Sequence, residues 1–236
     1  MNGHGSQPRK GLPRAADVVI ATAALFLAAP LLALATIAIK LTSRGPVFYT
    51  QRRVGKDGEI FELLKLRTMR RGADPVGVGT AVTDDDPRVT LVGRLLRRFA
   101  LDELPNLFNV LTGEMAIVGP RATLAAQVEL YTPRQRRRLE LKPGVTGWAQ
   151  THGRAGIPWE ERIELDVWYV ENRSLALDLK ILALTPLALL KGTGISSPDA
   201  YAGSAPDSPL RQAAEREREL ELRERLEPRP PRAGQD

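Results

Sequence analysis

The longest apolar run of the chain lies near its N-terminus, between Ala16 and Leu41. From Val18 to Ile39 it carries no charged residue, and a run of that length can span the hydrocarbon core of a bilayer as one straight helix. Pro30 stands near its middle, and a proline inside a helix removes a hydrogen bond and kinks or breaks the helix. The pattern therefore predicts a membrane segment that is broken at Pro30.

Three arrangements fit this apolar run: a straight transmembrane helix, a cleaved signal peptide, and a re-entrant helix that enters and leaves the bilayer on one face. Apolar residues continue past the small-residue cleavage site at 33–35, which disfavours the signal peptide. The positive-inside rule places basic flanks in the cytoplasm. Only the re-entrant helix keeps both flanks there, so it is favoured, and the other two arrangements stay open. The flanking residues are Arg9, Lys10 and Arg14 before the run and Lys40, Arg44, Arg52, Arg53 and Lys56 after it.

The pattern after residue 42 predicts short elements in a mostly helical α+β fold. Val47–Leu66 alternates around a Lys-Asp-Gly turn and predicts a small β-hairpin. Residues 143–159 are rich in glycine and predict a loop. Helices are predicted over Val89–Arg98, Asp102–Leu111, Thr123–Lys142 with a capped start at Thr132, Trp159–Asn172, and Leu175–Leu190. The last is broken at Pro186 and either packs on a membrane interface or lies in it.

Changes in composition predict four regions. They are a flexible N-terminus at 1–13, the re-entrant membrane helix at 14–41, a mostly helical domain at 42–195, and a charged C-terminal tail at 196–236. The tail alternates glutamate and arginine with few apolar residues, so i,i+4 ion pairs can hold it as a solvated helix. It carries no pattern that indicates chemistry.

Composition narrows the class of partner. The 236 residues carry a formal net charge of +6, which suits anionic partners such as nucleotides, lipid headgroups or nucleic acid. Aromatic residues make up only 5%, which is too few for a surface that stacks nucleic-acid bases. The absence of cysteine excludes disulfides and thiolate metal sites.

Two adjacent acids, Asp102 and Glu103, stand in an otherwise apolar stretch. On a helix they diverge by about 100°, so they cannot share one proton. They can take different tasks at one phosphate, one attacking and the other binding a metal or handling a proton. Local spacing alone favours an ordinary helix start, because acids stabilise a helix N-terminus and Pro105 suits a first turn.

Four cations from separate segments are candidates for a phosphate site: Lys65, Arg97, Arg121 and Arg154. Any one of them alone is explained as a solvated surface charge. Together they suit a diphosphate next to a membrane, because guanidinium groups bind phosphate oxygens in pairs.

Five stretches, taken in order, resemble the bacterial sugar transferases, the monotopic polyprenyl-phosphate phosphoglycosyl transferases that start lipid-linked glycan assembly. The resemblance covers about Arg14 to Ile195. The stretches are PRAAD, RGPVFYTQRRVGKDGEIFELLKLRTM, DDDPRVTLVGRLLRRFALDELPNLFNVLTGEMAIVGPRA, KPGVTGWAQTHGR and ELDVWYVENRSLALDLKIL. Two departures from the family pattern are Ala29, where serine often precedes the helix-breaking proline, and Ala122, where proline is common.

The resemblance implies a membrane enzyme of the bacterial inner membrane, with its catalytic domain on the cytoplasmic face. Its partners are a UDP-sugar, undecaprenyl phosphate and the bilayer, without nucleic acid, and its cofactor is Mg²⁺. Asp102 attacks the sugar-side phosphate and expels UMP. Polyprenyl phosphate then displaces the aspartyl phosphosugar, giving the first intermediate of exopolysaccharide, O-antigen or glycoprotein glycan assembly.

By motif position, the resemblance assigns phosphate binding to four cations, Lys65, Arg97, Arg121 and Arg154. It makes Asp102 the magnesium ligand, with or without Glu103. Glu103 is left as metal ligand, base or positioning group. Arg14 and Asp17 are spaced to pair at the membrane face. A glycosyltransferase that releases UDP and a non-catalytic membrane scaffold are the alternatives, and the residues do not indicate the sugar.

Overall fold

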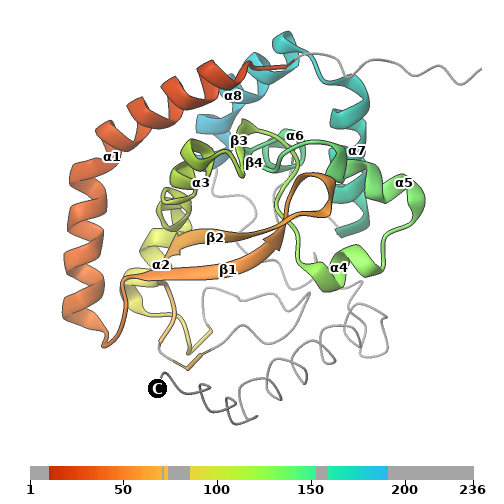
Figure 1. Cartoon of the computed structure of the whole chain (residues 1–236). Coiled ribbons are helices and arrows are strands. Elements are labelled where there is room, and N and C mark those ends of the chain that lie inside the picture. The colour runs from red at the N-terminus through yellow and green to blue at the C-terminus, as the bar shows by residue number, and fades with distance from the viewer. Residues whose placement is uncertain (1–10, 71, 74–85, 153–158, 191–236) are drawn as a thin grey trace, which may run out of the picture.

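The computed structural model describes residues 11–70, 72–73, 86–152 and 159–190. Helices dominate, with one antiparallel hairpin and one parallel strand pair, so the expected α+β class is confirmed (Figure 1). The α-helices and strands are α1 (Arg14–Thr42), β1 (Phe48–Val54), β2 (Ile60–Leu66), α2 (Leu91–Arg98), α3 (Asn106–Thr112), β3 (Ala116–Val118), α4 (Ala125–Glu129), α5 (Pro133–Arg136), β4 (Gly144–Thr146), α6 (Trp148–Thr151), α7 (Trp159–Asn172) and α8 (Leu175–Leu190); the 3-10 turns are η1 (Lys56–Gly58), η2 (Leu101–Glu103) and η3 (Arg137–Glu140).

Helix α1 is one continuous helix of 29 residues with Pro30 inside it. Figure 1 shows that it bends near its middle, which is what a proline does when it removes one helical hydrogen bond without ending the helix. The break predicted at Pro30 is therefore a bend in an uninterrupted helix. By length and composition, α1 is able to cross a membrane.

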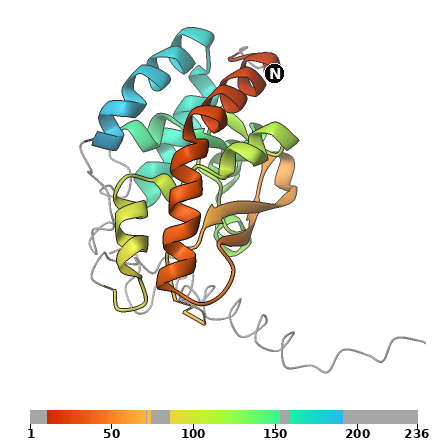
Figure 2. The same cartoon turned by 90° about the vertical axis from the view of Figure 1, so that its left-hand side faces the viewer.

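The two halves of α1 pack on different parts of the protein. Ala21 in the first half joins a core cluster that includes Val110 of α3. Ile39 in the second half joins a cluster with Leu66 of β2 and Leu96 of α2. Figure 2 shows α1 lying along one face of the molecule. The outer side chains of α1 are largely exposed, including Phe26 at 81%, Leu27 at 76% and Leu41 at 81%.

The start of α1 is fastened by polar contacts with the domain. The Arg14 guanidinium donates to the carbonyls of Val110 and Leu111 at the end of α3, and the Asp17 carboxylate accepts the Ile117 N–H at 3.0 Å. The predicted Arg14–Asp17 pair is wrong. The last carbonyls of α3 have no partner within their own helix, so they compete successfully for the arginine.

The hairpin confirms its prediction, with β1 antiparallel to β2 and Phe48 opposite Leu66. It turns through Asp57 and Gly58 at φ of 56° and 86°, a left-handed conformation that glycine adopts at no steric cost. Asn109 of α3 fixes the other edge of β2, because its amide accepts the Leu64 N–H at 3.1 Å and donates to the Glu62 carbonyl at 2.7 Å.

Three predictions about helices need correction. Asp102 and Glu103 lie on η2, and α3 begins only after Pro105, because a left-handed Ala100 (φ 52°) redirects the chain after α2. Residues 123–142 form α4, α5 and η3 in place of continuous helical structure. Helix α8 continues through Pro186 instead of breaking there.

Two further results concern the middle of the chain. The capped start at Thr132 is confirmed, since its hydroxyl accepts the Gln135 N–H at 3.3 Å. Within the predicted loop at 143–159, the structure places β4 and α6. β4 pairs in parallel with β3, and both strands are three residues long, too short to show an alternating pattern.

Candidate active site

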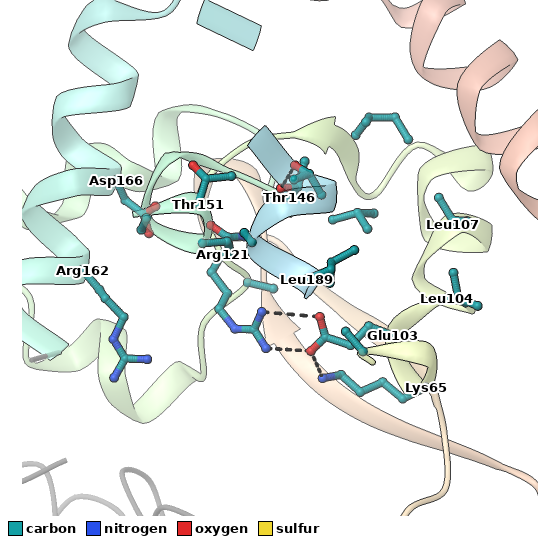
Figure 3. A pocket seen from close by; sticks show the side chains of 18 of the residues that line it. Lys65, Glu103, Leu104, Leu107, Arg121, Thr146, Thr151, Arg162, Asp166 and Leu189 are labelled. Atoms are coloured by element: carbon teal, nitrogen blue, oxygen red, sulfur yellow. Dashed lines mark hydrogen bonds and ion pairs between the residues drawn. The ribbon is translucent and has the colours of Figure 1, made fainter. Parts of the chain in front are cut away.

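A cavity of about 540 Å³ opens between α1, the hairpin, η2, the β3–β4 pair and the helices α6 to α8. Five of the residues singled out from the sequence line it: Lys65, Arg97, Asp102, Glu103 and Arg121. Figure 3 shows the side chains of Lys65, Glu103 and Arg121 converging. Arg154 lies outside the described residues. The tertiary structure thus brings together acids and cations that are up to 56 positions apart in sequence.

Local structure explains how each cation reaches the cavity. Lys65 stands near the end of β2, opposite Tyr49. Arg97 stands in the last turn of α2, a helix that begins at Thr90, whose hydroxyl accepts the Gly93 N–H at 2.9 Å. A Cβ on Gly93 would lie 2.0 Å from the Thr68 carbonyl oxygen. Only glycine therefore allows α2 to pack this closely against the chain that follows β2.

Glu103 is engaged by two cations at once. Its Oε1 accepts from Lys65 Nζ at 2.7 Å and from Arg121 Nη2 at 2.7 Å, and its Oε2 faces Arg121 Nη1 at 3.5 Å. Burial by itself would raise the pKa of Glu103, but the charges and hydrogen bonds of Arg121 and Lys65 outweigh it and hold that pKa well below its usual range. Glu103 is therefore ionised and orients both cations.

Asp102 lies in the opposite electrostatic situation. Among the residues that the structure describes, no hydrogen bond or ion pair holds its carboxylate. Burial raises the pKa of Asp102, and the adjacent charge of Glu103 adds to this. The cations Lys65, Arg97 and Arg121 lower it without cancelling the effect. A half-buried carboxylate without a partner, beside several cations, is chemically available in a way that Glu103 is not.

A second acid–arginine pair in the cavity was not anticipated from the sequence. Arg138 of η3 donates to the Asp166 carboxylate of α7 and to the Tyr131 hydroxyl, and its Nη2 donates to the Arg121 carbonyl at 2.9 Å. Arg138 and Asp166 are buried. The pair therefore holds the main chain of Arg121, the residue whose guanidinium meets Glu103. The available signal was Asp166 itself, an acid flanked on α7 by the buried positions Ile163 and Val167.

The cavity has walls of different character. Figure 3 shows Asp166 and Arg162 on one side and Leu104 and Leu107 on the other, with the ion pairs of Glu103 below and between them. Further apolar lining comes from Ile20 and Ala24 of α1 and from Leu182, Ala188 and Leu189 of α8. A polar ligand and an apolar one can therefore meet at the same carboxylate.

The donor set allows only one kind of metal site here. Across the described residues, no group of three or more histidine, aspartate or glutamate side chains is placed to hold a metal ion. Both oxygens of Glu103 face cations, and Arg138 binds Asp166, so Asp102 is the one described carboxylate of the cavity that no cation binds directly. Mg²⁺ accepts such a site, because it binds through one or two carboxylates plus substrate phosphates and water.

Comparisons with known proteins agree with this arrangement. A family model described as bacterial sugar transferase matches residues 9–192. The chain is 49% identical over 177 residues to EpsL of Bacillus subtilis, named an uncharacterized sugar transferase, covering 74% of this chain and 86% of that protein.

Two relatives carry more specific names. A UDP-glucose:undecaprenyl-phosphate glucose-1-phosphate transferase of Escherichia coli is 45% identical over 184 residues, covering 74% of this chain and 39% of that protein. A UDP-N-acetylgalactosamine-undecaprenyl-phosphate N-acetylgalactosaminephosphotransferase of Aeromonas hydrophila is 39% identical over 189 residues, covering 78% and 44%. The family match spans most of the chain and includes every site residue named above, and the chain belongs to the bacterial sugar transferase family.

Proposed function

We propose that this protein transfers a sugar phosphate from a UDP-sugar to polyprenyl phosphate at a membrane, and so starts the assembly of a lipid-linked glycan. Relatives with 39–45% identity are named as undecaprenyl-phosphate sugar phosphotransferases. The observation that carries the proposal is the contrast within one turn. Asp102 has no hydrogen bond or ion pair to its carboxylate from the residues that the structure describes, while Glu103 beside it binds Lys65 and Arg121 at 2.7 Å.

In the first half of the proposed reaction, a carboxylate oxygen of Asp102 attacks the phosphorus that carries the sugar. The bond from this phosphorus to the bridging oxygen breaks, and the bridging oxygen leaves with UMP. Lys65, Arg97 and Arg121 stabilise the charge on the phosphate oxygens as the bond order changes. Asp102 is then joined to the sugar phosphate as an acyl phosphate.

In the second half, a phosphate oxygen of polyprenyl phosphate attacks the same phosphorus and displaces the Asp102 carboxylate. The product is a polyprenyl-diphospho-sugar, and the enzyme returns to its starting form. Two displacements at one site allow a water-soluble donor and a membrane acceptor to use the same cations in turn.

We propose Mg²⁺ as the cofactor, held by Asp102 together with substrate phosphate oxygens. When bound, the ion would reduce the repulsion between the carboxylate and the phosphates. Glu103 acts as a positioning group, because it already holds the two cations in place.

For the membrane, we propose that α1 is re-entrant and that the catalytic domain lies on the cytoplasmic face. The bend in α1 and its exposed apolar side chains support this arrangement, as do the basic residues on both flanks. The exposed leucines of α2 and α8, such as Leu91 at 77% and Leu179 at 53%, support contact of these helices with the lipid interface.

The released nucleotide tests the reaction. Purified protein is incubated with Mg²⁺, undecaprenyl phosphate and a panel that includes UDP-glucose and UDP-N-acetylgalactosamine. We expect UMP, and without the acceptor we expect a protein adduct of sugar-phosphate mass on the peptide containing Asp102. Release of UDP would indicate a glycosyltransferase, and absence of any nucleotide product across the panel would indicate a scaffold.

Labelling tests the topology, and the absence of cysteine simplifies it. Single cysteines are introduced at Lys10 and Lys56, one on each flank of α1. With a membrane-impermeant thiol reagent on intact cells, both are expected to stay unlabelled until the cells are opened. Labelling of either position from outside contradicts the re-entrant arrangement.

A further inference from the structure

Two of the helices that contribute apolar residues to the cavity, α1 and α8, are joined at one end. The Asp178 carboxylate, in the first turn of α8, accepts the Leu12 N–H at 2.7 Å, two residues before α1 begins. Asp178 is fully buried and also accepts the Tyr169 hydroxyl at 2.6 Å. A Cβ on Gly11 would lie 2.3 Å from Asp178 Oδ2, so glycine permits the close approach there. Farther along both helices, their facing side chains line the cavity.

One stripe of each helix faces the cavity. On α1 it comprises Ile20 and Ala24, four residues and about one turn apart. On α8 it comprises Leu182, Thr185 and Leu189 at i, i+3 and i+7, with Ala188 beside them. The apolar members of both stripes are only partly buried. Ile20, Ala24 and Leu182 pack on one side against the core cluster that includes Ile181 and Val110, and they also line the cavity.

An apolar surface next to phosphate-binding cations points to an amphipathic ligand. The nucleotide donor is polar throughout, and burying polar groups against hydrocarbon without hydrogen bonds costs free energy. Polyprenyl phosphate has one anionic end followed by isoprenoid units. With its phosphate at Asp102, those units are the part of either substrate that gains from apolar contact.

We infer that the α1–α8 stripe, formed by Ile20, Ala24, Leu182, Ala188 and Leu189, binds the isoprenoid units next to the phosphate of the acceptor. This inference rests on the proposed function, because it assumes a polyprenyl phosphate acceptor. The nucleotide and sugar then occupy the opposite side, where Arg162 and Asp166 stand. The hydrogen bond from Leu12 to Asp178 ties the chain just before α1 to the first turn of α8.

Filling the stripe tests the inference. Ala24→Phe and Ala188→Phe place a large side chain into the cavity from opposite helices. Val19→Phe and Ala183→Phe are matched controls, because these positions are exposed on the outer faces of the same helices, Val19 at 67%. We expect each inward variant to raise the KM for undecaprenyl phosphate about tenfold or more. In the control variants, we expect the KM for undecaprenyl phosphate to change less than about twofold. In all four variants, we expect the KM for the UDP-sugar to change less than about twofold.

A second measurement separates the inference from the mechanism on which it rests. Exchange of labelled UMP into the UDP-sugar, measured without acceptor, reports the first half-reaction alone, and the inward variants should retain it. If the wild type shows no exchange while the acceptor KM still rises in the inward variants only, the covalent mechanism fails and the stripe stands. If the inward variants leave the acceptor KM unchanged, or raise the donor KM instead, the stripe does not bind the acceptor.

Wild-type protein provides a test that does not depend on how the variants fold. An undecaprenyl phosphate analogue that carries a photoreactive group on its first isoprenoid units is irradiated with the full-length protein, and the labelled peptides are sequenced. Adducts on α1 and α8 at the stripe support the inference. Adducts confined to the outer face of α1 or to other helices overturn it.

Discussion

The cavity contains two pairings of carboxylates with arginines. They differ in whether an acid remains that no cation binds directly. At Arg138 and Asp166 one acid meets one cation, both are buried, and the arginine also binds a carbonyl and a hydroxyl. At η2 two acids lie near the cations Lys65 and Arg121. Of the two acids, only Glu103 accepts hydrogen bonds from these cations. The pair at Arg138 holds structure, and the surplus acid at η2 is available for chemistry.

The difference shows that proximity to an arginine does not by itself identify a catalytic acid. Burial raises the pKa of Asp166 as well, although the charge and hydrogen bond of Arg138 lower it. What distinguishes Asp166 is that its carboxylate is bound by Arg138, so this pair holds the fold together. Asp102 is disfavoured in its charged form because burial is not offset by a direct partner. The charged form of such a carboxylate is stabilised when a ligand binds next to it. A nucleophile or a metal ligand requires this condition.

The largest effect is expected from Asp102→Asn. The amide keeps the shape of the side chain but cannot attack phosphorus, so kcat should fall about 10⁴-fold or more. The rate of UMP release under single-turnover conditions measures the effect, with Asp57→Asn in the exposed hairpin turn as the acid-to-amide control. Full turnover by Asp102→Asn would remove the distinction between the two pairings.

The next effect should be on folding and should come from the other pairing. Arg138→Met leaves Asp166 buried without its partner and is expected to destabilise the protein by about 3–5 kcal/mol. Adding Asp166→Leu should restore much of the loss, because no uncompensated charge remains. Urea unfolding in detergent measures both variants. A stable single variant would mean that the pair does not hold this part of the fold.

A smaller effect on activity is expected from Glu103→Gln. The amide can no longer hold Lys65 and Arg121 by charge, so both cations lose position and kcat/KM should fall about 100-fold. Steady-state kinetics with the UDP-sugar varied measures this. A loss equal to that of Asp102→Asn would show that the two acids act as one unit rather than in separate roles.

The smallest effect is a difference in how stability depends on pH. The pKa of Glu103 is lowered in the folded state, so its stabilisation is present above its unfolded pKa and is lost as the pH falls through the folded pKa. The pKa of Asp102 is raised, so its ionised form disfavours folding at neutral pH, and this penalty disappears as the pH falls below about 4, its unfolded pKa.

Urea unfolding between pH 7 and pH 3 compares the two amide variants with the wild type. We expect Glu103→Gln to be less stable at pH 7 and Asp102→Asn to be equally or more stable, with both differences shrinking toward acid. If the stability differences of both variants from the wild type had the same sign and the same dependence on pH, the environments assigned to Asp102 and Glu103 would be contradicted.

The sequence by itself determined much of this protein. The uncharged run from Val18 to Ile39, the alternation in the hairpin, the extents of α7 and α8, and the ordered family motifs are all local patterns. Local patterns are set by backbone geometry and by the spacing of apolar residues. They were sufficient to select Asp102, Glu103, Lys65, Arg97 and Arg121, all of which line the cavity.

Only the tertiary structure decided how those residues divide their work. Asp102 and Glu103 are neighbours in sequence, and no local pattern indicates that Lys65 and Arg121 both turn to the second acid. Nor does it indicate that Arg14 binds α3 carbonyls, that Arg138 meets Asp166, or that α1 and α8 share a cavity wall. Each outcome depends on which charges and surfaces long-range packing brings together, because desolvation and pairing are properties of the folded site.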